Sequence, residues 1–156
     1  MYWKVFTDFP PAFKVNGRPG HSTRETWFTV FSKETVRPII AILSSDLFWW
    51  WYTITTNCRD LNPYDIHNFP VPETALKDET LYYLGEKYLK DIQRNSTMLV
   101  RQQKQTGRTE TQSFKIQKSK YIIDQIDHLL AKHYGFTEEA LDFITNYDIK
   151  YRMGLI

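Results

Sequence analysis

Apolar and polar residues alternate in two stretches near the start of the chain. The stretch "YWKVFTDF" (residues 2–9) is rich in aromatic and β-branched side chains, and two prolines end it. The stretch "TWFTVFS" (residues 26–32) alternates bulky with small or polar side chains. Between them, "AFKVNG" leads into the loop "NGRPGHSTRE", which is rich in turn-forming residues. This pattern predicts β structure for residues 1–37.

The apolar spacing becomes helical in the next segment. Apolar side chains recur three and four residues apart and predict a short helix over residues 36–43. The triplet Ser-Ser-Asp at residues 44–46 supplies good N-caps for a second helix, which carries the aromatic run "FWWWY" (residues 48–52). The segment "NCRDLNPYDIHNFPVP" is then expected to be a loop with one helical turn at residues 62–66.

Amphipathic patterns dominate the second half of the chain. A long helix is predicted over residues 76–103. Its apolar stripe consists of Leu81, Leu84, Tyr88, Ile92 and Leu99. The polar segment "KQTGRTETQSFKIQKS" is expected to be a loop with a short extended piece at residues 113–117. A second helix is predicted over residues 119–133, ended by Gly135, and a third follows the N-cap Thr137.

Together these patterns predict an α+β fold in two parts. Residues 1–72 are expected to form a small β-rich module, and residues 73–156 an antiparallel helical module. With 156 residues, the chain can form one sizeable core or two small ones. The hydrophobic content of 42% and the charged content of 24% are ordinary for a globular protein, whereas the aromatic content of 16% is high.

Charge and cysteine content give limited information about the ligands and the cellular location of the protein. The net charge of +2 is too small to indicate nucleic-acid binding by itself, so any basic surface must come from local clustering. The single cysteine, Cys58, excludes an internal disulfide framework and fits the cytoplasm, where we expect the protein to act. No apolar stretch has the length of a membrane span, and the first residues lack the pattern of a signal peptide, so no membrane partner is expected.

The sequence contains no recognisable catalytic or metal-binding motif. Of its four histidines (His21, His67, His128 and His133), the last two are five residues apart on one predicted helix and do not share a face. The tetrapeptide "NPYD" partly matches the NPP-aromatic motif of amino-methyltransferases, but it differs at the third position, and a simple turn is favoured. No nuclease, P-loop or esterase pattern is present. We expect no metal, no cofactor and no catalysis by this chain alone.

Polar loops offer side chains that are suited to DNA. Arginine and asparagine pair bidentately with guanine and adenine edges, whereas lysine and serine suit phosphates. We expect Arg24 and Arg59 to read base edges, with two asparagines as secondary readers and the other residues at phosphates. The full candidate set is Lys14, Asn16, Arg18, Ser22, Arg24, Asn57, Arg59, Lys104 and Arg108, of which the last two, between the predicted helices, are the weakest. The alternative for such loops is simple solubility.

The segment around the tryptophans resembles a known family. "ILSSDLFWWWYTITTNCRDLNPYDIHNFPVP" is similar to the closing segment of target-recognition domains in DNA restriction–modification proteins. There, an aromatic-rich helix after "LNS" or "LSS" leads to a loop, a "P-x-D-I" turn and a final "FPxP". The segment looks most like the TaqI-like C-terminal specificity domain of fused type II enzymes, which carry an N6-adenine methyltransferase upstream. The tail "SKYIIDQIDHLLAKHYGFTEEALDFITNYDIKYRMG" resembles the C-terminal ending of the same proteins.

The resemblance implies a module that reads double-stranded DNA, followed by helices that space it or dock it. The docking partners would be methyltransferase and nuclease domains of the same or a partner chain, which would hold the catalytic motifs that are missing here. A complete recognition domain is usually longer than residues 1–72, so the chain is expected to be the C-terminal piece of a larger protein or the product of a degraded gene. The alternative function is a protein-interaction module whose long helices pair with another subunit or a second copy.

The tryptophan run is interpreted as a scaffold. The side chains of residues 48–52 point in all directions around a helix, so most of these rings are expected in the core. There they would hold the following "NCRDLN" loop in place. Stacking of one ring on a base is the less favoured alternative.

Overall fold

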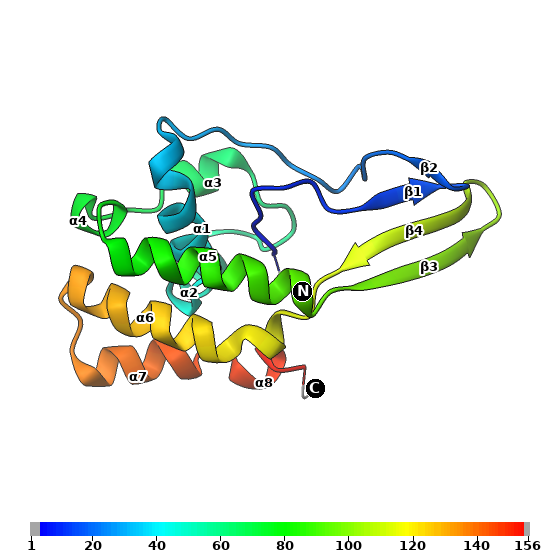
Figure 1. Ribbon diagram of the computed structural model, residues 1–156. Coiled ribbons are helices and arrows are strands. Elements are labelled where there is room, and N and C mark those ends of the chain that lie inside the picture. The colour runs from blue at the N-terminus through cyan, green and yellow to red at the C-terminus, as the bar shows by residue number, and fades with distance from the viewer. Residues whose placement is uncertain (1–3, 155–156) are drawn as a thin grey trace.

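A β-sheet arm projects from one side of a helical body (Figure 1). The computed structural model describes residues 4–154. In that range the arm is one four-stranded antiparallel sheet in the order β2-β1-β4-β3. Its strands are β1 (Phe13–Val15), β2 (Arg18–Pro19), β3 (Thr97–Gln103) and β4 (Gly107–Ser113). The predicted α+β class is confirmed.

The body is built from helices of both halves of the chain. Two short 3-10 helices, η1 (Lys33–Thr35) and η2 (Ile116–Ser119), precede α1 and α6. The α-helices are α1 (Val36–Ser44), α2 (Asp46–Thr55), α3 (Pro63–His67), α4 (Glu73–Leu76), α5 (Glu79–Arg94), α6 (Lys120–Tyr134), α7 (Glu138–Asn146) and α8 (Ile149–Arg152). α5 packs against both α1 and α6, and α7 packs against α2 and α6. The helices predicted over residues 36–43, over the aromatic run and over residues 119–133 are confirmed.

Local capping explains where several helices begin and end. The hydroxyl of Ser45 accepts a hydrogen bond from the backbone N–H of Phe48 and starts α2. Asp78 caps α5 and Thr137 caps α7 in the same manner. Gly135 ends α6 in the left-handed conformation, with a φ of 71°. These signals lie within a few residues of each helix end and are therefore readable from the sequence.

The close packing of α1 against α5 depends on Gly85. A Cβ atom at this position would lie 2.2 Å from the backbone carbonyl oxygen of Arg37. Because a backbone atom cannot rotate away as a flexible side chain can, only glycine allows the two helices to approach this closely. This contact joins the N-terminal half of the chain to the C-terminal half.

One hydrophobic cluster runs through the body. Among the residues that the structure describes, it extends from Phe6 to Ile144 and includes buried side chains on both sides of residue 72. The strands also come from both sides, since β1 pairs with β4. Residues 1–72 and 73–156 therefore share one core and one sheet.

The aromatic run lies mostly inside this core, as expected. Phe48, Trp49 and Tyr52 are buried, and Trp50 and Trp51 are partly buried against the cluster. Two further phenylalanine rings meet Phe48 edge-on, at centroid distances of 5.7 and 5.2 Å. This geometry is favourable for aromatic pairs and helps to fix α2 in the body.

Most of the β structure predicted for residues 1–37 is wrong. Residues 4–9 and 26–32 form no strand, and the start of the first predicted strand lies outside the described residues. In the first stretch, the side chain of Phe6 is buried in the helical core. In the second, Trp27 and Phe31 are exposed. Alternation shows which face of a segment is apolar, but a strand also needs a neighbouring strand for its backbone hydrogen bonds.

The helix predicted up to residue 103 is wrong at its C-terminal end. α5 ends at Arg94, and Leu99, which the apolar stripe includes, lies instead in β3 with 42% of its surface exposed. The polar segment predicted as a loop contains β4, and most of the predicted extended piece at residues 113–117 is not a strand. β3 and β4 satisfy their backbone groups by pairing with each other, which side-chain periodicity does not reveal.

A buried ion-pair network ties the first half of the chain to the C-terminal helices. One carboxylate oxygen of Asp46 lies 2.9 Å from Nζ of Lys120, and the other lies 2.8 Å from Nε of Arg152. Asp46 and Arg152 expose only 1% and 3% of their surface. At the N-terminus of α2, Asp127 accepts hydrogen bonds from the backbone N–H groups of Asp46 and Leu47, at 3.1 Å each. The network therefore connects α2, α6 and α8.

We expect Asp46→Ala to destabilise the protein strongly. The substitution leaves Lys120 and Arg152 without their buried counter-ion, and breaking a buried pair costs about 3–5 kcal/mol. Asp124 also pairs with Lys120, but its side chain is 41% exposed. Asp124→Ala should therefore cost less than about 1 kcal/mol. Urea denaturation of both variants measures these losses, and equal losses would contradict the importance of Asp46.

Candidate nucleic-acid interface

Two turns meet at the free end of the arm, which we call the tip (residues 14–18 and 104–108). The backbone N–H of Asn16 donates to the carbonyl of Arg108 (2.8 Å), and the side-chain oxygen of Asn16 accepts from the N–H of Arg108 (2.9 Å). Gly107 leaves room for this side chain, since a Cβ atom there would lie 2.4 Å from the same oxygen. Asn16, a predicted secondary reader, therefore holds the two turns together.

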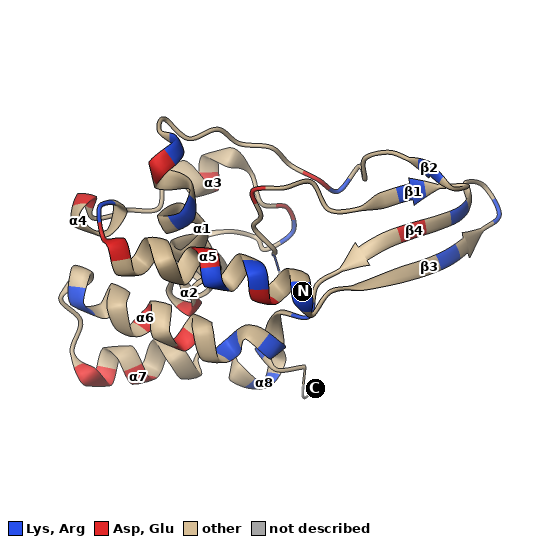
Figure 2. Cartoon of the chain, in the orientation of Figure 1, with Lys and Arg blue, Asp and Glu red and all other residues tan. Residues whose placement is uncertain are grey.

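The arm is strongly basic. Residues 13–19 and 97–113 contain five basic residues and one acidic residue, in a chain whose net charge is only +2. In Figure 2, blue segments mark the strands and the turn of the arm, and the one red segment lies on β4. The excess of positive charge is therefore concentrated on the element that projects furthest from the body.

Four of the predicted phosphate contacts gather at the tip. They are Lys14, Arg18, Lys104 and Arg108, and all four are exposed. Arg108 pairs with Glu110 at 3.0 Å, whereas the other three side chains form no ion pair with any residue in the described range. Exposed, unpaired cations on a projecting element are suited to an anionic polymer.

The remaining predicted residues lie away from the tip. Ser22 and Arg24 lie in the segment between β2 and η1, where the hydroxyl of Ser22 accepts from the N–H of Arg24 (3.2 Å). Asn57 and Arg59 lie on the body after α2, and the side-chain oxygen of Asn57 accepts from the N–H of Arg59 (3.1 Å). Lys4 donates to the carbonyl of Arg59 (3.1 Å) and holds this loop against the N-terminal segment. The structure thus groups five of the nine predicted residues and leaves four in two other places.

Three polar residues of β3 are missed by the sequence-based prediction. Arg101, Gln102 and Gln103 fall in the predicted helix, but they lie on the outer strand of the sheet and are exposed. A signal for the hairpin exists in the sequence, because the turn residues "TG" (residues 106–107) lie between a segment that begins with the apolar stretch "TMLV" and the alternating stretch "RTETQS".

A groove of about 250 Å³ lies on the body at the base of the arm. We call it the basal groove. It is lined by Tyr83, Glu86, Lys87, Lys90, Asp91, Arg94 and Tyr121. Two of its three basic side chains are paired with acidic neighbours on α5, and the third lies 5.6 Å from the centre of the Tyr121 ring. Because of these internal pairs, the basal groove attracts anions less strongly than the tip does.

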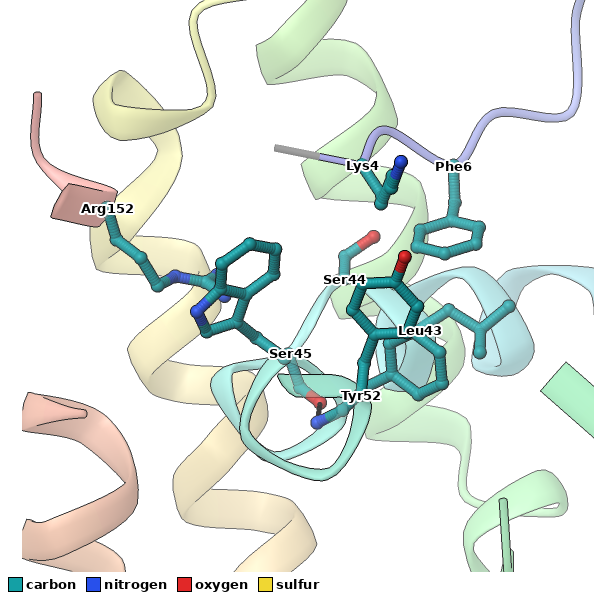
Figure 3. A pocket seen from close by; sticks show the side chains of 9 residues that line it. Lys4, Phe6, Leu43, Ser44, Ser45, Tyr52 and Arg152 are labelled. Atoms are coloured by element: carbon teal, nitrogen blue, oxygen red, sulfur yellow. Dashed lines mark hydrogen bonds between the residues drawn. The ribbon is translucent and has the colours of Figure 1, made fainter. Parts of the chain in front are cut away.

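A second cavity, between the N-terminal segment and helices α1 and α2, is much smaller. Its volume of about 10 Å³ is enough for one water molecule at most. Figure 3 shows Lys4 and Phe6 at one side of it, Ser44 and Tyr52 beside them, and Arg152 at the opposite side. This cavity is too small for a cofactor or an organic substrate.

Three carboxylates lie close together in the body but fit a metal ion poorly. Oxygen atoms of Asp46, Asp124 and Asp127 lie within 4.8 Å of one another. Lys120 and Arg152 already pair with two of these carboxylates, those of Asp46 and Asp124. Burial, together with the neighbouring carboxylate of Asp46, raises the pKa of Asp127 well above its ordinary value, and both oxygens of Asp127 already accept hydrogen bonds from the start of α2. The cluster is better explained as part of the ion-pair network.

His133 links a hydroxyl to a carboxylate. Its Nδ1 lies 3.0 Å from Oγ1 of Thr74, and its Nε2 lies 2.6 Å from a carboxylate oxygen of Asp78. This order of groups can activate a nucleophile, but Asp78 is also the N-cap of α5, and Thr74 lines neither cavity described above. Burial opposes ionisation of Asp78, but the hydrogen bonds from His133 and from the start of α5 outweigh it and lower its pKa. We interpret the chain of contacts as a link between α4, α5 and α6.

Comparisons with known proteins do not identify a relative. No protein-family model, curated protein or solved structure matches the chain. Between residues 4 and 154, no helix combines the length and the apolar character that are needed to cross a bilayer. The function must therefore be inferred from the residues of the arm and the body.

We expect the raised pKa of Asp127 to make the protein less stable as the pH rises above about 4. The unfolded chain releases this proton near pH 3.8, whereas the folded chain retains it to higher pH. The folded state then binds more protons, so the free energy of unfolding decreases by up to about 1.4 kcal/mol per pH unit until the folded-state pKa is passed.

Asp127→Asn tests this expectation because it removes the titrating group and keeps one acceptor for α2. Its free energy of unfolding should decline less steeply with pH than that of the unmodified chain. Chemical denaturation at several pH values from about 4 to about 8 measures the two profiles. Parallel profiles would mean that Asp127 is ionised in the folded protein.

Proposed function

We propose that this chain is a DNA sequence-recognition module of a restriction–modification enzyme and that it is not catalytic by itself. The observation that carries the proposal is the basic tip of the arm, where Lys14, Arg18 and Lys104 are exposed and form no ion pair within residues 4–154. Neutralisation of phosphates by such side chains supplies most of the sequence-independent affinity for DNA. A narrow, projecting arm also reaches base edges in a groove that a broad surface cannot enter.

The resemblance of the aromatic segment and the tail to target-recognition domains supports the same proposal. Double-stranded DNA is then the ligand, and the helical body positions the arm on it. Methyltransferase and nuclease activities belong to other domains, in the same chain or in a partner, and the protein acts in the cytoplasm. This division of labour agrees with a sequence that has no catalytic motif.

The tryptophans act as a scaffold in this proposal. Trp49 is buried, stacks on the ring of Tyr151 at a centroid distance of 6.0 Å, and has the guanidinium of Arg152 5.2 Å from its ring. It is thereby tied to α8. Trp50 and Trp51 are partly buried against the core. Rings held in this way stabilise the body and are poorly placed to stack on a base.

A helical protein-interaction module is the less favoured function. Its two long helices, α5 and α6, already bury their apolar faces inside the body, including Leu84, Ile92 and Ile126. Helices whose apolar stripes are buried within one body offer little apolar surface to another subunit.

Neutralising the tip should weaken both DNA binding and its dependence on salt. The triple variant Lys14→Gln, Arg18→Gln and Lys104→Gln keeps polar side chains but removes three positive charges. If each charge meets one phosphate, the slope of log K against log salt should decrease in magnitude by about 0.9 for each contact. Fluorescence anisotropy with a randomised duplex pool, at salt concentrations from about 50 to about 200 mM, measures the affinity and the slope.

The matched control replaces three exposed lysines of the body, Lys33, Lys77 and Lys132, by glutamine. Its net charge equals that of the tip variant, so a general effect of charge appears in both. We expect only the tip variant to lose affinity. Equal losses in the two variants, or no salt-sensitive binding by the unmodified chain, would refute the proposed function.

A further inference from the structure

The outer strand of the arm has the properties of a binding surface. β3 forms one edge of the sheet, and all seven of its residues are exposed. Met98, Leu99 and Val100 expose 48%, 42% and 50% of their surface. Figure 1 shows the β3–β4 hairpin extending beyond the body with no helix over either of its faces. Antiparallel sheets ordinarily bury one face, and long exposed edges ordinarily find a partner, so this hairpin is suited to a ligand that covers it.

The last three residues of β3 carry side chains that can read base edges. They are Arg101, Gln102 and Gln103. No hydrogen bond or ion pair within the described part of the chain engages the side chain of Arg101 or Gln102. The side-chain oxygen of Gln103 accepts from the hydroxyl of Thr106 (2.6 Å), which orients the side chain and leaves its amide N–H groups for another partner. In the major groove, arginine pairs bidentately with guanine, and glutamine with adenine.

We propose that β3 is the base-reading strand and that the β3–β4 hairpin enters the major groove of duplex DNA. This inference depends on the proposed function, because it requires DNA as the ligand. A sheet with its side chains is about 10 Å thick, and the major groove is about 12 Å wide, so the hairpin fits with the β3 edge directed inward. Side chains alternate along a strand, so Arg101 and Gln103 lie on one face of the hairpin and Gln102 lies on the other. In this orientation both faces lie close to base edges.

Positive charge lies at both ends of the reading strand. Lys104 and Arg108 lie at the tip, and the basal groove, where α5 leads into the arm, keeps a smaller net positive charge because its Lys90 and Arg94 are paired with acidic residues of α5. A strand of seven residues is about 23 Å long, so a β3 strand that runs along the groove places the two clusters about 23 Å apart beside the phosphates that border it. The phosphates on either side of the groove are therefore the expected partners of these two clusters.

A second copy of the chain is the main competing occupant of the β3 edge. In a symmetric antiparallel pair of β3 strands, the tip of each copy would lie beside the basal groove of the other. Lys104 and Arg108 would then approach a groove whose three basic and two acidic side chains leave a net positive charge, so the two surfaces would not attract each other. A polyanion is complementary to the same basic surface, so the charges favour DNA over a second copy.

Gln102→Ala and Gln103→Ala test the inference because they remove no charge. We expect each variant to bind a randomised duplex pool with the same salt dependence as the unmodified chain. Each should also lose at least about tenfold in discrimination at one base pair of the preferred site. Sequencing of the bound duplexes identifies that site, and competition between it and single-base variants of it measures the discrimination.

Gln125→Ala is the matched control, since Gln125 is an exposed glutamine on α6 of the body. It should retain the full preference. Unchanged preference in both β3 variants, or binding without any sequence preference by the unmodified chain, would overturn the inference and leave DNA binding itself in place. Sedimentation analysis tests whether a second copy of the chain binds the β3 edge. A dimer that dissociates in the β3 variants would also overturn the inference. A complete lack of salt-sensitive DNA binding by the unmodified chain would instead refute the proposed function.

Discussion

Much of the arrangement of the body depends on the buried carboxylate of Asp46. A charge in a protein interior is tolerated only when its counter-ions are held beside it, and here Lys120 and Arg152 supply them from α6 and α8. Lys120 lies 74 residues further along the chain, so this single pair fixes α2 against a distant helix. Asp127, also on α6, caps α2 by accepting hydrogen bonds from its first two backbone N–H groups. Electrostatic pairing thus links α2 to α6 and α8, and the aromatic rings of α2 add to the packing.

A firmly held body gives the arm a defined direction. α5 is fixed to α1 by the close contact at Gly85, and β3 follows α5 after a short connection. At the other end of the arm, Asn16 joins the two turns of the tip. An arm that is fixed to the body at its base, and whose two turns are held together at its tip, keeps its side chains in place better than an isolated hairpin does. This arrangement suits the proposed sequence-reading role of the arm.

The helices could be predicted because their signals are local. The N-caps Ser45 and Thr137 and the C-terminal Gly135 lie within one turn of the helix ends that they determine. The pairing of β1 with β4 could not be predicted in the same way, because it is not local: Arg108 and Asn16, which join the two turns of the tip, are 92 residues apart. A helical stripe that continued to Leu99 also concealed the start of the hairpin.

For the candidate site, the sequence by itself determined which residue types were available. Basic and amide side chains in polar segments indicated a surface for DNA, and five of the nine candidates meet at the tip. Only the tertiary structure decided which of them lie together. In the folded chain, the side chains of Asn16, Ser22 and Asn57 accept hydrogen bonds from backbone N–H groups. Arg101 and Gln102 lie on the open edge of the sheet. The physical reason is that side-chain chemistry belongs to each residue, whereas exposure and neighbourhood arise from hydrogen bonds and burial between segments that are distant in the chain.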